Sequence, residues 1–505
     1  MSRVRRNIAA NFIGRGWGIV SVYLFVPLYL QFLGVEAYGL VGVYSMLVGI
    51  LALADVGLTA TLSREMARLG MLNGAEGRMR DLLRTYEVAY LAISLASAVG
   101  LWMTAPYLAS RWLQAGTLTP AEITTAIRAM GIAIAFQLPS GLYNGGLLGL
   151  QRQVTFNALQ VAWGILRGVG SVAVLWLVSP TIIAFAICQL AVNAIYCIAV
   201  RTSLWRAMPA RTLQPHFDRG LLRETWQYAA GMASISVLSA ALTQTDKLVV
   251  SKILPLEMLG YYSLAGTLAS VPLMLANPVG MAIFPRLTGL VAVVDREALL
   301  RLYHRACSLV SIVVLPCALT FLLYSDNLLF AWTGSSTVVQ HVGLTTAFLL
   351  AGQIMQAITV IPFYLALAHG QTRLIVRVQL LGVLLIMPLL MVLVGRVGVV
   401  GGGIAWLVMN VCTLCPYMYF LHRRFLRGEL QTWAQQDVGR PLVSALAVAV
   451  LGRWVLPLPA TRLASVATVV LVWAMAMAAS ALSVAEWRGI LAQKARDLIP
   501  ASNVG

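Results

Sequence analysis

Charged residues are scarce in this chain, and acidic ones are scarcer than basic ones. Only 11% of its 505 residues are Asp, Glu, Lys or Arg, whereas 60% are hydrophobic. Soluble globular chains carry about 25% charged residues, so this composition excludes a soluble protein and indicates a polytopic membrane protein. No hydrophilic stretch is long enough for a catalytic domain: the longest are 63–83, 201–224 and 326–341.

Motifs for nucleotide hydrolysis and metal binding are missing as well. The chain contains no Walker A pattern, and Gly401-Gly402-Gly403 is interpreted as a flexible helix entry. All six cysteines lie in apolar segments. Cys412 and Cys415 have the spacing of a redox or zinc pair, but without a second ligand pair we interpret them as small hydrophobic residues. We therefore expect no enzymatic activity, cofactor or metal.

Long apolar runs are abundant. Segments of about 20 apolar residues bounded by charges, Gly or Pro have the length of a transmembrane helix. They predict an all-α polytopic membrane protein with about 14 transmembrane helices, at 7–32, 38–62, 84–107, 123–149, 154–177, 180–200, 225–253, 258–285, 302–325, 342–368, 374–394, 398–421, 438–457 and 463–484.

The basic residues flank these segments on one side. With a cytoplasmic N-terminus, most of the 36 Lys and Arg fall in cytoplasmic loops, and few remain for the outer loops: Arg111, Lys252, Arg396, Arg453 and Arg462. This bias predicts cytoplasmic N- and C-termini. It also explains the net charge of +18 without a nucleic-acid partner.

An internal repeat is visible in two places. LGVEAYGL (33–40) is similar to LPLEMLGYY (254–262), with Glu36 and Gly39 aligned on Glu257 and Gly260. LADVGLTATLSR (53–64) is similar to LANPVGMAIFPR (275–286) at nearly the same offset. Six spans separate the copies, and because six is even, both copies have the same orientation.

The repeat predicts two six-helix lobes with a cavity between them near the membrane midplane. We expect an N-terminal lobe, a cytoplasmic inter-lobe linker, a C-terminal lobe, additional helices 13 and 14, and a cytoplasmic tail, at residues 1–200, 201–224, 225–424, 438–484 and 485–505.

Four stretches resemble the Wzx-type polysaccharide flippases: YLQFLGVEAYGL, ALADVGLTATLSRE, TDKLVVSKILPLEMLGYYSLA and the basic N-terminus. This family belongs to the superfamily that also holds the MATE drug exporters and the lipid II flippases. The resemblance implies two six-helix bundles in a V and movement of polyprenyl-diphosphate-linked oligosaccharide across the inner membrane. It implies no particular glycan.

Two arginines inside predicted spans lie on polar helix faces. Arg167 is about 20 Å into its span at 1.5 Å per residue, on a polar face with Asn157, Gln160, Gly164 and Ser171. A buried ion pair with a carboxylate, or a contact with a carbonyl, competes with lining a hydrated cavity. Arg15 shares a face with polar residues and glycine, and either lines the cytoplasmic mouth of the cavity or snorkels to the headgroups.

Four other intramembrane charges have two interpretations each. Asp246 and Lys247 line the cavity or extend outward, and Arg128 binds substrate or lies at the outer interface. Asp55 has a coupling role, by protonation, or a structural role, by holding Arg64 or Arg15.

The candidate substrate-binding residues are thus Arg15, Arg128, Arg167 and Lys247. They outnumber Asp55 and Asp246, which favours an anionic substrate, because guanidinium groups bind phosphate oxygens in a bidentate manner. We expect a lipid-linked oligosaccharide flippase that works by alternating access, driven by a proton, a sodium ion or the membrane potential.

Two other functions compete with this one. A MATE-type drug or cation antiporter should carry excess carboxylate in its N-terminal lobe, and a membrane-embedded polymerase or glycosyltransferase should have a substantial outer loop. The expected partners are the lipid-linked substrate and membrane lipids, with a polysaccharide polymerase and a chain-length regulator as further candidates.

Overall fold

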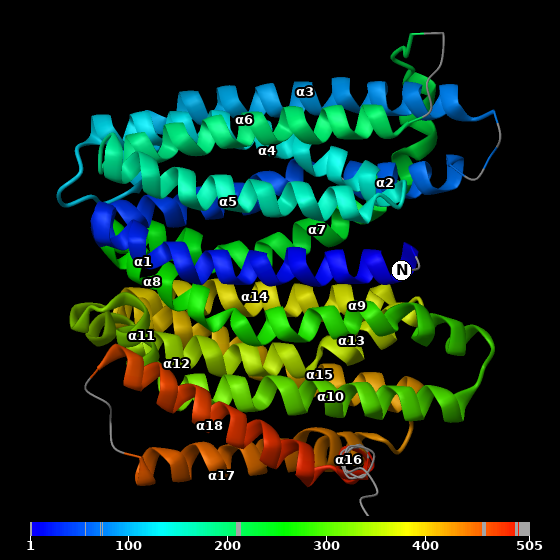
Figure 1. The fold of residues 1–505 in the computed structure, drawn as a ribbon, viewed down its shortest axis with the longest axis vertical. Coiled ribbons are helices and arrows are strands. Elements are labelled where there is room, and N and C mark those ends of the chain that lie inside the picture. Colours follow the sequence, from blue (N-terminus) through cyan, green and yellow to red (C-terminus); the bar gives the residue numbers. More distant parts are fainter. Residues whose placement is uncertain are drawn as a thin grey trace, which may run out of the picture. The chain divides into compact units, whose positions relative to one another are not determined.

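The computed structural model describes residues 3–55, 57–70, 72, 74–208, 214–456, 461–489 and 493. Within these ranges, the side chains of 3–13, 15, 19, 224–236, 239 and 372–374 are not described. The described residues form helices, turns and loops, with one isolated bridge between Gln114 and Pro255. The expected all-α class is confirmed (Figure 1).

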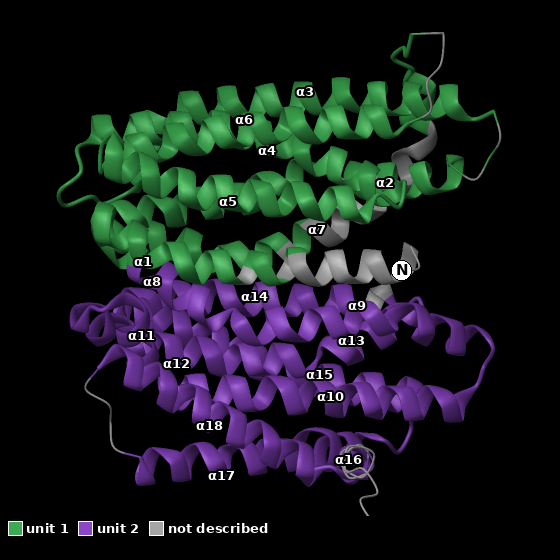
Figure 2. Cartoon of the chain, in the orientation of Figure 1, with its two compact units in different colours: residues 1–260 green, residues 261–505 purple. Residues whose placement is uncertain are grey.

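The chain forms two compact units, Met1–Gly260 and Tyr261–Gly505 (Figure 2). The helices of unit 1 are α1 (Arg3–Leu51), α2 (Leu58–Leu69), α3 (Glu76–Tyr107), α4 (Pro120–Gly149), α5 (Gln153–Leu177), α6 (Ile182–Ala207) and α7 (Arg219–Ile253), and α8 (Leu256–Ala269) begins in this unit. The short turns η1 (Ala52–Asp55) and η2 (Leu108–Trp112) follow α1 and α3.

The helices of unit 2 are α9 (Val271–Ala292), α10 (Arg296–Leu323), α11 (Ser325–Thr333), α12 (Ser336–Ile358), α13 (Val360–Ala368), α14 (Thr372–Val397), α15 (Val399–Phe425), α16 (Leu430–Thr432), α17 (Arg440–Val455) and α18 (Arg462–Ser483). The turn η3 (Trp433–Gly439) precedes α17. Helices α17 and α18, which correspond to predicted spans 13 and 14, pack on α10.

The boundary between the compact units lies later than the predicted linker at 201–224. Helix α7 groups with unit 1 because it packs on α1, α2 and α3. The predicted division into 1–200 and 225–424 concerns the sequence repeat and stays a prediction.

Twelve helices among the described residues are long and apolar enough to cross a membrane. The sequence predicts about fourteen spans, two more than these twelve helices, because it divides α1 into two spans and counts α7 as a span. The division has a structural basis, because Gly34 interrupts α1 with φ 77° and ψ 171°, a conformation that L-residues with side chains avoid.

The outer surfaces of the helices are apolar, as a bilayer requires. Large side chains such as Trp176, Val443, Trp454 and Leu463 are 66–85% exposed, which is unfavourable in water but not in lipid. Several helices begin at a polar capping residue. Before α4, for example, the hydroxyl of Thr119 accepts a hydrogen bond from the backbone N–H of Glu122 at 3.3 Å, and Glu122 accepts one from the backbone N–H of Thr119 at 2.8 Å.

The first pair of repeat segments packs together inside unit 1. A Cβ added to Gly39 would overlap the carbonyl oxygen of Leu256, and one added to Gly260 would overlap the carbonyl oxygen of Val35. Val35 and Leu256 are separated by the same offset as Gly39 and Gly260, so the contact is reciprocal. Such reciprocity supports the repeat that the sequence predicts.

The second pair of repeat segments differs in conformation. The first copy breaks between η1 and α2, where Gly57 has φ 73°. The second copy lies within the continuous helix α9, which contains Pro278 and Pro285. Similar sequences therefore give a broken helix in one copy and an unbroken helix in the other.

Candidate functional site

Arg167 lies on the face of α5 that packs against α1. The opposite face is exposed: Ile165 and Leu166 are 42% and 43% accessible. On the inner face, a Cβ on Gly168 would overlap the ring of Phe25 in α1. Asn157 and Ser171 of the polar stripe are buried, so its expected inward orientation is confirmed.

The guanidinium of Arg167 is half-buried and lies over an aromatic ring. Its central carbon is 5.4 Å from the ring centroid of Trp163, one helical turn away. Its charge also acts on the hydroxyl groups of Tyr29 and Tyr44 in α1. No carboxylate or carbonyl of the described residues pairs with it, so its five N–H donors remain available for water or a ligand.

Hydrogen bonds join four helices beside Arg167. The hydroxyl of Tyr44 donates to Oε1 of Gln137 at 3.1 Å, and Nδ2 of Asn193 donates to the Tyr44 hydroxyl at 2.9 Å. Trp163 donates its indole N–H to Oδ1 of Asn193 at 3.1 Å. We call Tyr44, Gln137, Trp163, Arg167 and Asn193 the polar cluster.

The sequence search for charged residues missed the neutral members of the polar cluster. Gln137 and Asn193 are polar residues inside otherwise apolar spans, and that pattern alone indicates a functional or structural role in a membrane. Tyr44 and Trp163 carried no such signal, because aromatic residues are common in transmembrane helices.

Lys247 and Asp246 lie on α7, which runs antiparallel to the second half of α1. A Cβ on Gly49 would come 2.5 Å from the side-chain amide of Gln244. Together with the Gly39–Leu256 contact, this register places half-buried Lys247 near the level of Tyr44 in α1. Asp246 is buried, at 9% exposure. The structure therefore places Lys247 on the helix pair that also carries a member of the polar cluster.

Asp55 stabilises the break between η1 and α2. Its carboxylate accepts hydrogen bonds from the backbone N–H of Thr59 at 3.1 Å and from the Thr59 hydroxyl at 2.6 Å. That hydroxyl is also 2.8 Å from the hydroxyl of Tyr90 in α3. These contacts make Asp55 a cap of α2; the two roles expected from the sequence, coupling by protonation and holding Arg64 or Arg15, stay predictions.

Arg128 is not brought to the polar cluster. Its guanidinium carbon is 4.7 Å from the ring centroid of Trp102 in α3. It precedes Gln137 by nine residues, and at 100° per residue this places the two side chains on opposite sides of α4. Arg128 therefore points away from the cluster, and both interpretations of it, substrate binding and a place at the outer interface, stay predictions. Arg15 belongs to α1, but its side chain lies outside the described residues.

A second polar group, centred on Glu87 of α3, connects the ends of three helices in unit 1. The buried Glu87 carboxylate accepts hydrogen bonds from Arg201 Nε at 2.8 Å, the Trp205 indole at 2.8 Å and the Tyr143 hydroxyl at 3.0 Å. Arg84 forms a further ion pair with it at 3.3 Å. Arg201 and Arg84, predicted only to orient the chain, therefore also bind a buried carboxylate.

Replacing Glu87 with glutamine should destabilise unit 1 by about 2 kcal/mol, because hydrogen bonds to a charged group contribute about 1.5–3 kcal/mol. Thermal unfolding of the purified protein in detergent measures this. Glu297→Gln is the matched control, since Glu297 pairs with Arg301 on an exposed helix face and such pairs contribute under about 1 kcal/mol. Equal losses in both variants would contradict a special role for Glu87.

The polar cluster is chemically suited to an anion. It offers a guanidinium without a carboxylate partner among the described residues, together with amide and hydroxyl groups. The indole ring beneath Arg167 holds the guanidinium plane without neutralising it. Such a group binds phosphate oxygens more readily than it binds a cation.

The sequence matches a family model described as "Polysaccharide biosynthesis protein" over residues 31–336. A curated protein of Shigella flexneri, "Putative O-antigen transporter", is 22% identical over 382 residues, which cover 74% of this chain and 87% of that protein.

Two solved structures are similar in fold. "Lipid II flippase MurJ, inward closed conformation" superposes with a TM-score of 0.72 at 13% identity, covering 97% of this chain and 99% of that one. An inward-facing multidrug resistance MATE family transporter of the MOP superfamily gives a TM-score of 0.68 at 12% identity, covering 86% and 99%. The MATE-like fold expected from the resemblance is thereby confirmed.

Proposed function

Since the chain belongs to the polysaccharide biosynthesis protein family, we propose that it flips polyprenyl-diphosphate-linked oligosaccharide across the bacterial inner membrane. In this proposal the chain binds the diphosphate and the first sugars, while the polyprenyl tail stays in lipid. The similarity to a protein named as an O-antigen transporter supports a glycan substrate of this class.

The observation that carries the proposal is the environment of Arg167. Its guanidinium lies near the middle of α5, on the inner face, and has no carboxylate partner among the described residues. A charge in the membrane interior is costly, at about 2.5–3.5 kcal/mol on insertion scales. A diphosphate that neutralises this charge offsets the cost, and the polar cluster can donate hydrogen bonds to attached sugars.

The charge balance separates this proposal from a drug or cation antiporter. A site for cationic drugs needs a carboxylate that is free to bind them. In unit 1, Asp55 caps a helix, Glu87 binds two arginines, and the buried Asp246 lies next to Lys247 in α7. The fold is shared with MATE transporters, but the described polar cluster has the charge of an anion site.

The transport cycle in this proposal is alternating access. The two compact units would change their relative arrangement, so that the bound head group meets first one side of the membrane and then the other. A proton gradient, a sodium gradient or the membrane potential would drive the cycle. The termini would be cytoplasmic, and a polysaccharide polymerase and chain-length regulator would act on the exported product.

Deleting the gene in a strain without a redundant flippase tests the proposal. We expect a lipid-linked saccharide to accumulate on the inner leaflet, and its structure identifies the glycan. Restoring the wild-type gene should remove the accumulated lipid. If no such lipid accumulates, and the deletion instead raises sensitivity to cationic drugs, the antiporter is the correct function.

A further inference from the structure

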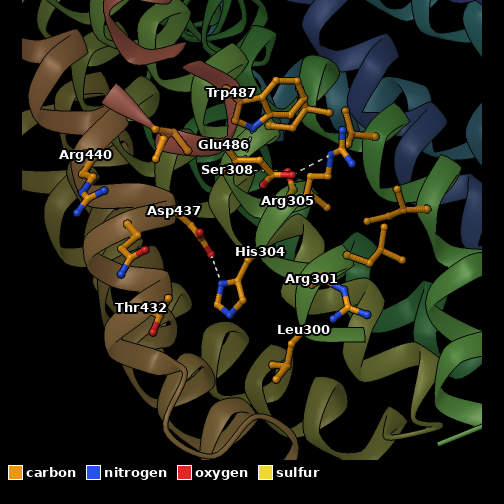
Figure 3. A pocket seen from close by; sticks show the side chains of 18 of the residues that line it. Leu300, Arg301, His304, Arg305, Ser308, Thr432, Asp437, Arg440, Glu486 and Trp487 are labelled. Carbon is orange, nitrogen blue, oxygen red and sulfur yellow. Dashed lines mark hydrogen bonds and ion pairs between the residues drawn. The ribbon is translucent and has the colours of Figure 1, made fainter. Parts of the chain in front are cut away.

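A cavity of about 960 Å³ lies at one end of unit 2, and none of its lining residues belongs to the polar cluster. Its walls come from α9, α10, the end of α16, η3, the start of α17 and the segment after α18 (Figure 3). Four arginines line it, Arg286, Arg301, Arg305 and Arg440. We call it the arginine cavity.

Two of these arginines already have carboxylate partners. Arg305 Nε is 3.4 Å from Glu486, and Arg301 is 3.3 Å from Glu297. Arg286 and Arg440 form no ion pair or hydrogen bond through their side chains with the described residues. The arginine cavity therefore has two guanidinium groups whose charge no carboxylate of the described residues neutralises.

Internal contacts hold the walls of the arginine cavity in place. His304 Nδ1 is 2.6 Å from Asp437, which ties α10 to η3. The indole N–H of Trp487 donates to the Ser308 hydroxyl at 3.1 Å, which ties the segment after α18 to α10 (Figure 3). These contacts account for His304 and Asp437 as structural residues and leave the arginines to bind a ligand.

Apolar side chains make up most of the remaining lining of the arginine cavity. Val279, Ile283 and Leu309 line it beside the arginines. Helix α10 has 28 residues and is about 42 Å long at 1.5 Å per residue, longer than the hydrocarbon core of about 30 Å. The excess is about 12 Å, and Arg301 and Arg305 lie about 8 Å and 14 Å from the first residue of α10, so we place the arginine cavity at the boundary between head groups and hydrocarbon.

We propose that the arginine cavity binds the phosphate group of a membrane lipid, with Arg286 and Arg440 holding the phosphate oxygens and the apolar wall contacting the lipid chains. Both an ordinary anionic phospholipid and a polyprenyl diphosphate carry this group on an apolar chain. Inorganic phosphate lacks the chain and would lose the apolar contact. The site is separate from the polar cluster and does not rest on the proposed function.

Native mass spectrometry of the purified full-length protein in detergent tests the site with four probes: phosphatidylglycerol, a polyprenyl diphosphate, diacylglycerol and inorganic phosphate. We expect the two phosphate-bearing lipids to bind and the other two to bind at least about tenfold more weakly, a difference of about 1.4 kcal/mol, because diacylglycerol lacks the phosphate and inorganic phosphate lacks the apolar chain. Tighter binding of the diphosphate identifies the transported class of lipid as the ligand. Equal binding identifies ordinary membrane lipid.

The variants assign the binding to the arginine cavity. The double variant Arg286→Gln/Arg440→Gln should bind phosphatidylglycerol at least about tenfold more weakly. The double variant Arg286→Lys/Arg440→Lys should lose less affinity, because it keeps both charges. Arg427→Gln is the control, an exposed arginine of unit 2 that does not line the cavity. Wild-type binding by the Gln pair, or equal binding of diacylglycerol, would overturn the proposal.

A second measurement is independent of the variants. Photoactivatable phosphatidylglycerol should label residues 301–309 and 484–487 of the wild-type protein, and labelling confined to other segments would overturn the site. Arg167→Ala separates the two proposals, because it should leave this labelling unchanged even if it abolishes export.

Discussion

Export of lipid-linked oligosaccharide is expected to fall at least about tenfold when Arg167 is replaced with alanine. The guanidinium supplies charge-assisted hydrogen bonds to the diphosphate, each contributing about 1.5–3 kcal/mol, and about 1.4 kcal/mol corresponds to a factor of ten. Surface polysaccharide in a deletion strain carrying the variant measures the loss, together with the amount of protein in the membrane.

Two further variants at and near this position separate charge from geometry. Arg167→Lys keeps the charge but loses the planar fork, so we expect export between those of the wild type and the alanine variant. Arg152→Ala removes an exposed arginine at the start of the same helix and should export normally. Normal export by a stably inserted Arg167→Ala protein would show that this residue does not bind the substrate.

Replacing both Gly39 and Gly260 with alanine should destabilise the protein by several kcal/mol. Each new Cβ would overlap a backbone carbonyl oxygen of the facing segment, and a backbone cannot move aside as a flexible side chain does. Overpacking of this kind costs about 1–3 kcal/mol per site. Thermal unfolding in detergent measures the loss for the single and double variants.

Gly266→Ala is the matched control for these glycines. It lies in α8, as Gly260 does, but a Cβ there would meet nothing within 4 Å. Because alanine favours the helix over glycine by about 1 kcal/mol, this variant should be as stable as the wild type or more so. If Gly39→Ala and Gly260→Ala behave like Gly266→Ala, the two segments do not pack as closely as described.

The inward orientation of the α5 stripe was predictable because it depends on residues spaced along one helix. Asn157, Arg167 and Ser171 recur at helical spacing among apolar neighbours, and an apolar solvent excludes such a face. The direction of Arg128 was less predictable. Its face is recognised only by comparison with Gln137, and only the tertiary structure shows that Gln137 bonds to Tyr44.

The sequence by itself determined the class of the molecule and its approximate number of membrane-spanning segments, and it predicted their sidedness. Apolar length and flanking charge depend only on residues that are close together in the chain, and the repeat is found by aligning two segments of the sequence. Only the tertiary structure decided that Arg201 binds Glu87, that Asn193 donates a hydrogen bond to Tyr44, and that one cavity is lined by residues as far apart in the chain as Val279 and Trp487. Each of these contacts joins residues far apart in the chain, so it depends on how the helices pack.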